Sequence, residues 1–303
     1  MHSTDSLLSN CTICPRKCAV NRLKGQKGYC GADASLIVAR AALHFWEEPC
    51  ISGTMGSGTV FFGNCNLRCV FCQNHSIAVG NTGKKISIGR LADIFLELQQ
   101  KGAANINLVT PTHYIPQIIE ALHLAKEQGL SLPIVYNTGG YETVDSLRLL
   151  DGLIDIYLPD LKYYSPELSS KYSHAKDYFE TAVAALAEMY RQVGAPVFDA
   201  DSGMLQKGMI VRHLILPGQT KDSKKILRYL YETYGSNIYI SIMNQYTPLP
   251  HVAQIPELNR KVTSEEYDKV INFALRIGIE NAFIQEGETA QESFIPAFDL
   301  EGV

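Results

Sequence analysis

From about residue 59 onward, short apolar runs rich in β-branched residues alternate with stretches that have the spacing of amphipathic helices. Strict alternation of strand and helix predicts right-handed βαβ units and hence a parallel sheet. Roughly six such units favour a whole or partial (β/α) barrel over two separate domains. The apolar runs cover residues 60–62, 106–110, 134–137, 154–158, 210–216, 238–242 and 283–285.

The intervening helices carry local signals of their own. Apolar side chains at i, i+3, i+4 and i+7 predict one buried face per helix, and they are Leu91, Ile94, Phe95, Leu98, then Ile115, Ile118, Ile119 and Leu122. Glycines suited to a left-handed helix end stand at Gly102, Gly129, Gly194 and Gly278. Thr263 and Glu266 have the pattern of a capping box. Residues 196–208 and 244–262 are expected to be irregular.

All eight cysteines lie within the first 72 residues, which random placement would produce roughly once in a hundred thousand sequences. A chain of 303 residues buries enough apolar surface to fold without disulfides. The first ten residues lack the basic and apolar regions of a signal peptide, and no membrane-spanning apolar stretch follows. We therefore expect a cytoplasmic protein without a membrane partner, whose grouped cysteines are metal ligands or redox groups.

The charge balance also limits the partners. The sequence has 27 basic and 31 acidic residues and a net charge of −4, with no run of Lys and Arg. Such a surface disfavours generic nucleic-acid binding, which needs many cations along a phosphate backbone.

Three cysteines follow the first apolar run directly, as Cys65-x3-Cys69-x2-Cys72. In a parallel barrel this loop lies at the carboxyl end of the strands, where active sites are built. Three thiolates can hold three irons of a 4Fe-4S cluster and leave the fourth iron open to a substrate or cofactor. The alternative is a zinc site with His75 as the fourth ligand.

This motif, with Phe71 before its last cysteine, resembles that of the radical S-adenosylmethionine (SAM) superfamily. The whole chain, from CTICPRKC through EEPCISGTMGSGTVFFGNCNLRCVFCQN to its end, is similar to the PflX-type homologues of pyruvate formate-lyase activating enzyme. The resemblance implies an oxidoreductase with a partial (β/α)6 TIM-like barrel. It also implies a 4Fe-4S cluster whose unique iron binds SAM, cleavage to methionine and a 5′-deoxyadenosyl radical, and hydrogen abstraction from a substrate.

The partners implied by the resemblance are an electron donor such as flavodoxin or ferredoxin and a glycyl radical protein as substrate. Radical modification of a peptide, a small molecule or RNA is the alternative, because members of one family need not share a substrate. A non-enzymatic iron-sulfur or zinc protein is a second alternative. It predicts a cluster held by four protein ligands.

The resemblance also implies the residues that bind SAM. Asp160 and Lys162 match the Asp-x-Lys that contacts the SAM ribose and carboxylate. Arg212, if it faces inward, needs an anionic partner, which is the SAM carboxylate, a substrate carboxylate or a structural ion pair. Phe71 and Gln73 belong to a stretch that matches one packed on the adenine, although ordinary core packing is the alternative for Phe71. Further matches are Asn137 in a turn after the third strand and Tyr246 in the place of an adenine-contacting His.

One departure concerns the segment after the second strand, where the family has Gly-Gly-Glu. Here the sequence is Thr110, Pro111, Thr112 and His113. The backbone carbonyls of Thr110 and Pro111 could still accept the SAM amino group, since main-chain acceptors do not depend on the side chain. Thr112 and His113 either face the substrate or, for His113, begin a helix near solvent.

We expect a cysteine-rich metal-binding extension over residues 1–55 and the barrel over residues 56–303. The extension holds four cysteines in the order Cys11-x2-Cys14-x3-Cys18-x11-Cys30. This spacing fits a four-thiolate zinc site or an auxiliary iron-sulfur cluster. Cys50 is left over, as a buried thiol or as a hydrogen donor or extra ligand near the cluster.

Overall fold

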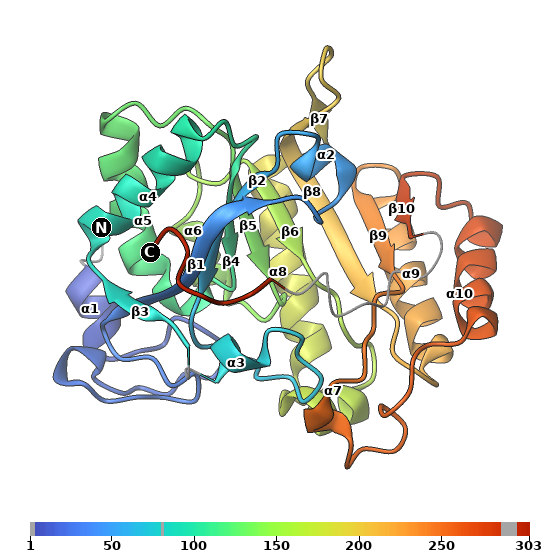
Figure 1. The fold of residues 1–303 in the computed structure, drawn as a ribbon. Coiled ribbons are helices and arrows are strands. Elements are labelled where there is room, and N and C mark those ends of the chain that lie inside the picture. Colours follow the sequence, from blue (N-terminus) through green and yellow to red (C-terminus); the bar gives the residue numbers. More distant parts are fainter. Residues whose placement is uncertain (1–3, 80–81, 286–295) are drawn as a thin grey trace.

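The computed structural model describes residues 4–79, 82–285 and 296–303. The strands of this part of the chain form one mostly parallel, open sheet (Figure 1). Its strand order is β10-β9-β8-β6-β5-β4-β2-β1-β3, with β7 paired to β8. The strands are β1 Leu36–His44, β2 Ser57–Phe62, β3 Lys84–Ile86, β4 Ile106–Val109, β5 Ile134–Thr138, β6 Ile156–Pro159, β7 Val197–Phe198, β8 Leu205–Leu214, β9 Tyr239–Met243 and β10 Ala282–Ile284.

The helices lie between the strands along the chain, except that α1 precedes the first strand. They are α1 Thr4–Ser9, α2 Pro49–Ser52, α3 His75–Ala78, α4 Ile88–Gln100, α5 Ile115–Glu127, α6 Val144–Arg148, α7 Pro166–Ser173, α8 Tyr178–Val193, α9 Thr220–Tyr234 and α10 Ser264–Ile277. Short 3-10 turns lie at η1 Arg22–Lys24, η2 Thr112–Tyr114 and η3 Pro250–Val252.

All seven predicted apolar runs are strands of the parallel part of the sheet. From β2 through β4, β5, β6, β8 and β9 to β10, each neighbouring pair is parallel. In the described residues the path ends at β10 on one side and β3 on the other, so the sheet does not close. The predicted α/β partial barrel is therefore confirmed, and every parallel strand places its carboxyl end on the same side.

The helix signals are confirmed as well. Leu91, Ile94, Phe95 and Leu98 are all buried on α4, and α10 begins with the capping box of Thr263 and Glu266. The four predicted glycines all have positive φ at the ends of their helices. Of the stretches expected to be irregular, residues 196–208 instead contain β7, whose hairpin with β8 projects at the top of Figure 1.

The expectation for the first 55 residues is wrong in one part. Residues 36–44 form β1, which pairs antiparallel with β2 and β3 and belongs to the sheet. The alanines of LIVARAALH weaken the local strand signal, and pairing on both edges is what makes this segment a strand. The C-terminal segment crosses β1 (Figure 1), where the Ala41 N–H donates to Glu301 O and the Arg40 guanidinium pairs with Asp299.

In the described part of the chain, no helix is both long and apolar enough to cross a membrane.

Candidate functional site

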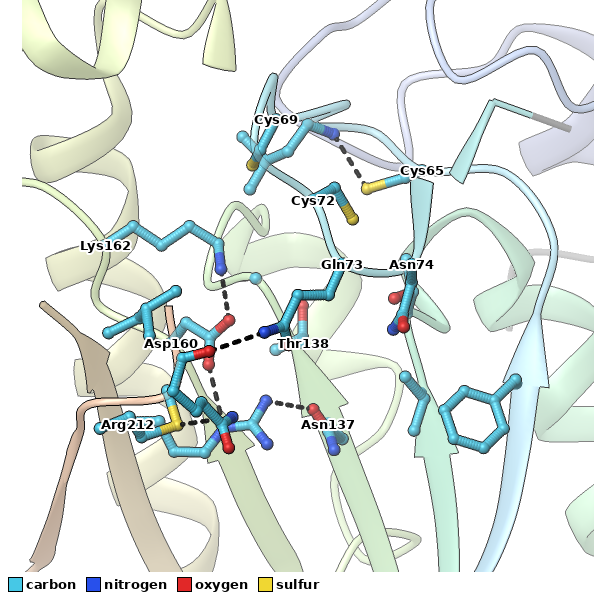
Figure 2. Close-up of a pocket in the computed structure, with 18 of the residues that line it drawn as sticks. Cys65, Cys69, Cys72, Gln73, Asn74, Asn137, Thr138, Asp160, Lys162 and Arg212 are labelled. Carbon is cyan, nitrogen blue, oxygen red and sulfur yellow. Dashed lines mark hydrogen bonds and ion pairs between the residues drawn. The ribbon is translucent and has the colours of Figure 1, made fainter. Parts of the chain in front are cut away.

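The three motif cysteines lie in the loop that follows β2, at the carboxyl ends of the parallel strands, as predicted. They line a cavity of about 220 Å³ together with residues that follow β4, β5 and β6 and with side chains of β8 (Figure 2). Asn64 and Arg68 have φ of 73° and 54°, in the left-handed region. The loop is therefore bent sharply beside Cys65 and Cys69, and such backbone strain is concentrated at functional sites in proteins.

The surroundings of these sulfurs suit thiolates that bind metal. The Leu67 N–H donates to Cys65 Sγ at 3.4 Å, and the Ser173 hydroxyl donates to Cys69 Sγ at 2.9 Å. Burial raises the pKa of Cys65 to about 11, so the free thiol keeps its proton at neutral pH. Hydrogen bonds directed at a sulfur stabilise it once a metal has displaced that proton. The donor set thus fits a cluster held by three thiolates.

The zinc alternative gains no support from the geometry. His75 stacks its ring on His251, with centroids 4.4 Å apart. Across the described residues, no group of three or more His, Cys, Asp and Glu side chains is spaced to hold a single metal ion. Three sulfurs that each bind a different iron of one cluster need not converge on a single point.

A chain of polar contacts lies beside the three thiols in the same cavity (Figure 2). Lys162 Nζ pairs with Asp160, and Arg212 Nε donates to the other Asp160 oxygen at 2.9 Å. Arg212 Nη2 donates to Asn137 Oδ1 at 2.6 Å. Burial alone would raise the pKa of Asp160, but the Arg212 and Lys162 cations outweigh it and hold that pKa below its usual value. Asp160 is therefore an anion at neutral pH.

Glu47 lines the cavity. From the sequence, this residue and Glu48 could either line the mouth of a substrate site or pack the N-terminal extension against the barrel. The Glu47 carboxylate accepts from Arg212 Nη1 at 3.1 Å and from the amides of Asn107 and Asn137 at 3.1 and 3.2 Å. Together with Asp160 it supplies the anionic partners that Arg212 was expected to need. The available signal was the acidic pair Glu47 and Glu48 before Pro49, but nothing in the sequence shows that the segment reaches the barrel interior.

The predicted adenine-contacting residues separate into two groups. Phe71 and Gln73 line the cavity, and Gln73 Nε2 donates to Gln245 O at 2.8 Å. Tyr246 does not line it. Its ring lies behind Phe71, with centroids 6.2 Å apart, and its hydroxyl donates to Leu258 O.

The segment that replaces Gly-Gly-Glu has an unusual backbone. Thr110 lines the cavity with φ of 59°, a conformation that suits glycine better than threonine, whereas Pro111 does not line it. His113 is buried, and its Nε2 lies 2.8 Å from Gly63 O. Burial lowers the pKa of His113 to about 3. Both expectations for His113, near solvent or facing the substrate, are therefore wrong.

Thr112 also turns away from the cavity. Its hydroxyl donates to Glu142 at 2.7 Å, and the Thr138 hydroxyl donates to the same carboxylate. Glu142 is only 1% exposed. These two threonines and Glu142 form a buried polar cluster in the cavity wall, and Thr138 also lines the cavity.

Cys50 lies apart from the cluster loop. It lines a different cavity, of about 650 Å³, with residues of α2, the β7 hairpin and the amino end of β9. It packs in an apolar cluster with Ile51, Val135 and Leu205. The structure thus places Cys50 as a buried thiol and not beside the cluster.

The sequence model of the radical SAM superfamily matches residues 59–230, more than half of the chain. The uncharacterized protein MJ0674 of Methanocaldococcus jannaschii is 27% identical over 285 residues, which cover 91% of this chain and 77% of that protein.

Two solved structures share the fold at low sequence identity. SuiB of Streptococcus suis bound to its precursor peptide SuiA has a TM-score of 0.52 and 12% identity over 74% of this chain and 47% of SuiB. The FeFe-hydrogenase maturase HydG from Carboxydothermus hydrogenoformans has a TM-score of 0.51 and 16% identity over 78% of this chain and 56% of HydG. The chain therefore spans about half the length of these two proteins.

Proposed function

The chain belongs to the radical SAM superfamily, and on this premise we propose that this radical SAM enzyme abstracts hydrogen from a glycine of a partner protein, as an activating enzyme does. The observation that carries the chemistry is one cavity that joins the three cluster thiols to the Asp160–Lys162 pair. When bound, the 4Fe-4S cluster and SAM supply reductive cleavage of the sulfonium and hydrogen abstraction. A flavodoxin or ferredoxin is the proposed electron donor.

The residues of this chain have the following proposed roles. Cys65, Cys69 and Cys72 hold three irons and leave the fourth open. Lys162 offers its ammonium to the SAM carboxylate, and Asp160 offers its carboxylate to the ribose hydroxyls.

Two further features of the cavity support these roles. The three guanidinium nitrogens of Arg212 already contact Asp160, Glu47 and Asn137, so its proposed role is to position these side chains. Apolar lining residues such as Phe71, Leu67 and Met243 keep water away from the reactive centre.

The rim of the cavity favours a polypeptide substrate over a small molecule. Trp46 lines the cavity and is 62% exposed, and its neighbour Phe45 is 51% exposed. Exposed aromatic side chains are enriched where proteins bind other polypeptides. The net charge of −4 argues against RNA.

The catalytic class is tested by anaerobic purification, reduction with dithionite and addition of SAM. We expect 5′-deoxyadenosine and methionine from the wild-type protein and from a Cys50→Ser control, and none from a Cys65→Ala, Cys69→Ala, Cys72→Ala triple variant. An intact, reduced cluster that yields no 5′-deoxyadenosine with SAM would contradict SAM cleavage by this chain.

The substrate is tested with a candidate glycyl radical protein encoded near this gene, labelled with deuterium at its glycine α-carbons. We expect deuterium in the 5′-deoxyadenosine and a glycyl radical signal in electron paramagnetic resonance. Transfer of label from a small molecule or RNA, with no glycyl radical, would instead support the alternative substrates.

A further inference from the structure

The four N-terminal cysteines come together beside the catalytic loop. The Cys11 N–H donates to Val20 O at 3.0 Å, and the Ala19 N–H donates to Cys11 O at 2.9 Å, so the first three cysteines share one closed loop. The Cys14 thiol lies close enough to the Cys30 and Cys11 thiols to interact with them electrostatically, and the Cys30 thiol interacts in the same way with those of Cys11 and Cys18. The four thiols therefore form a group, without any disulfide between them.

A backbone N–H group points at one of these sulfurs, as another does at a cluster ligand. In the catalytic loop the Leu67 N–H donates to Cys65 Sγ at 3.4 Å, and in the N-terminal loops the Tyr29 N–H donates to Cys18 Sγ. A thiol sulfur is a weak acceptor and a metal-bound thiolate a strong one, so this local structure serves a metal ligand.

The backbone beside Cys18 has the same kind of strain as the catalytic loop, namely positive φ at residues other than glycine. Lys17 and Ala19 have φ of 41° and 55°, and neither is a glycine. The Tyr29 N–H donates to Cys18 Sγ at 3.3 Å. A Cβ on Gly28 would lie 2.7 Å from the same sulfur. Only a glycine at this position therefore lets the segment that leads to Cys30 approach Cys18 so closely.

Two arginines near the four thiols, the buried Arg22 and the half-buried Arg68, lack acidic partners among the described residues. Arg22 is 1% exposed, and its guanidinium donates only to backbone carbonyls, at Asp33 and His113. Arg68 Nε is buried without a hydrogen-bond partner, and its Nη2 lies 3.4 Å from Cys30 O. Among the described residues, neither arginine forms an ion pair with a carboxylate.

An arginine keeps its charge in proteins, and a buried charge requires a compensating one. Four thiolates around a zinc ion, or around a cluster with the same charge, leave an excess of negative charge. That excess is the counter-charge that Arg22 and Arg68 lack.

We propose that Cys11, Cys14, Cys18 and Cys30 bind a second metal centre as thiolates, and that this centre is an iron-sulfur cluster. The N-terminal loops share two features with the loop that holds Cys65 and Cys69, namely positive φ at residues other than glycine beside a cysteine and a backbone N–H donated to a cysteine sulfur. This likeness to the catalytic loop favours several irons over one zinc.

The experiment uses the Cys65→Ala, Cys69→Ala, Cys72→Ala variant, which lacks the catalytic cluster and keeps the four N-terminal thiols. After anaerobic reconstitution with iron and sulfide we expect about four irons per chain, and about twice as many in wild type and in the Cys50→Ser control. Adding Cys14→Ser and Cys30→Ser to the triple variant should abolish the remaining iron.

The metal content of the triple variant distinguishes a cluster, a zinc site and the absence of a second metal centre. About one zinc and no iron in the triple variant would overturn the cluster and leave a zinc-thiolate centre. If the triple variant bound neither iron nor zinc after reconstitution with each metal in turn, the whole proposal would be overturned. Because the triple variant cannot cleave SAM, its metal content is independent of the proposed enzymatic function.

Discussion

At the scale of single residues, Glu142 stands out as a buried carboxyl group whose hydrogen bonds, within the described part of the chain, all come from hydroxyl groups. Thr112 and Thr138 donate to one of its oxygens, and the Tyr136 hydroxyl lies 3.5 Å from the other. Burial raises the pKa of Glu142 to about 7, although the hydroxyl donors oppose the shift. Between about pH 4.5 and pH 7 the folded protein thus keeps a proton on Glu142 that the unfolded chain gives up.

This difference predicts a pH-dependent loss of stability. The pKa of Glu142 is higher in the folded state than in the unfolded chain. Ionisation of Glu142 therefore lowers the free energy of unfolding, by nothing below about pH 4.5 and by an amount that grows until about pH 7. Glu142→Gln removes the titration. Relative to wild type, the variant should gain on the order of 3 kcal/mol between pH 5 and pH 8. Urea unfolding under anaerobic conditions measures this, and a pH-independent difference between the two proteins would contradict it.

At the scale of elements, the sequence predicted each parallel strand of the described residues, because these strands leave short runs of apolar β-branched residues, and from β2 to β9 the runs are largely buried. The strand β1 was missed, because its pairing with β2 and β3 is not local. The same limit applies to the site. The spacing of Cys65, Cys69 and Cys72 is local and predicted their shared loop, whereas Glu47 meets Arg212 only through tertiary packing.

The loops after β5 and β6 are held together by a close backbone approach at Gly140. A Cβ there would lie 2.2 Å from Asp160 O, and the φ of Gly140 is 79°. Tyr178 joins the same two loops, since its hydroxyl donates to Gly139 O and Asp160 O. Gly140 therefore fixes where Asp160 stands in the cavity.

Gly140→Ala should lower the free energy of unfolding by about 3 kcal/mol or more and weaken SAM binding, because the methyl group displaces the Asp160 backbone. Gly152→Ala is the matched control, since Gly152 has the same φ of 79° with nothing within 4 Å of its Cβ. It should lose only about 1 kcal/mol from backbone strain. Equal losses in urea unfolding would show that the close approach at Gly140 is unimportant.

At the scale of the whole molecule, the N-terminal loops support the catalytic loop directly. Arg16 donates to Asn66 O at 2.9 Å, and its guanidinium stacks on Tyr29 at 3.9 Å from the ring centroid. The Tyr29 hydroxyl donates to Leu67 O at 3.2 Å. These contacts reach the backbone between Cys65 and Cys69, so order in the first 35 residues is transmitted to the site that binds the cluster.

A protein without the N-terminal centre should therefore bind its catalytic cluster less firmly. In a Cys14→Ser, Cys30→Ser variant, the cluster at Cys65, Cys69 and Cys72 should release iron to a chelator about 10-fold faster than in wild type, because its supporting contacts are loosened. The absorbance of the iron–chelator complex follows the release, and Cys50→Ser should behave like wild type. If the remaining cluster released iron at the wild-type rate, the two sites would be independent, and the contacts of Arg16 and Tyr29 would serve only to pack the N-terminal loops.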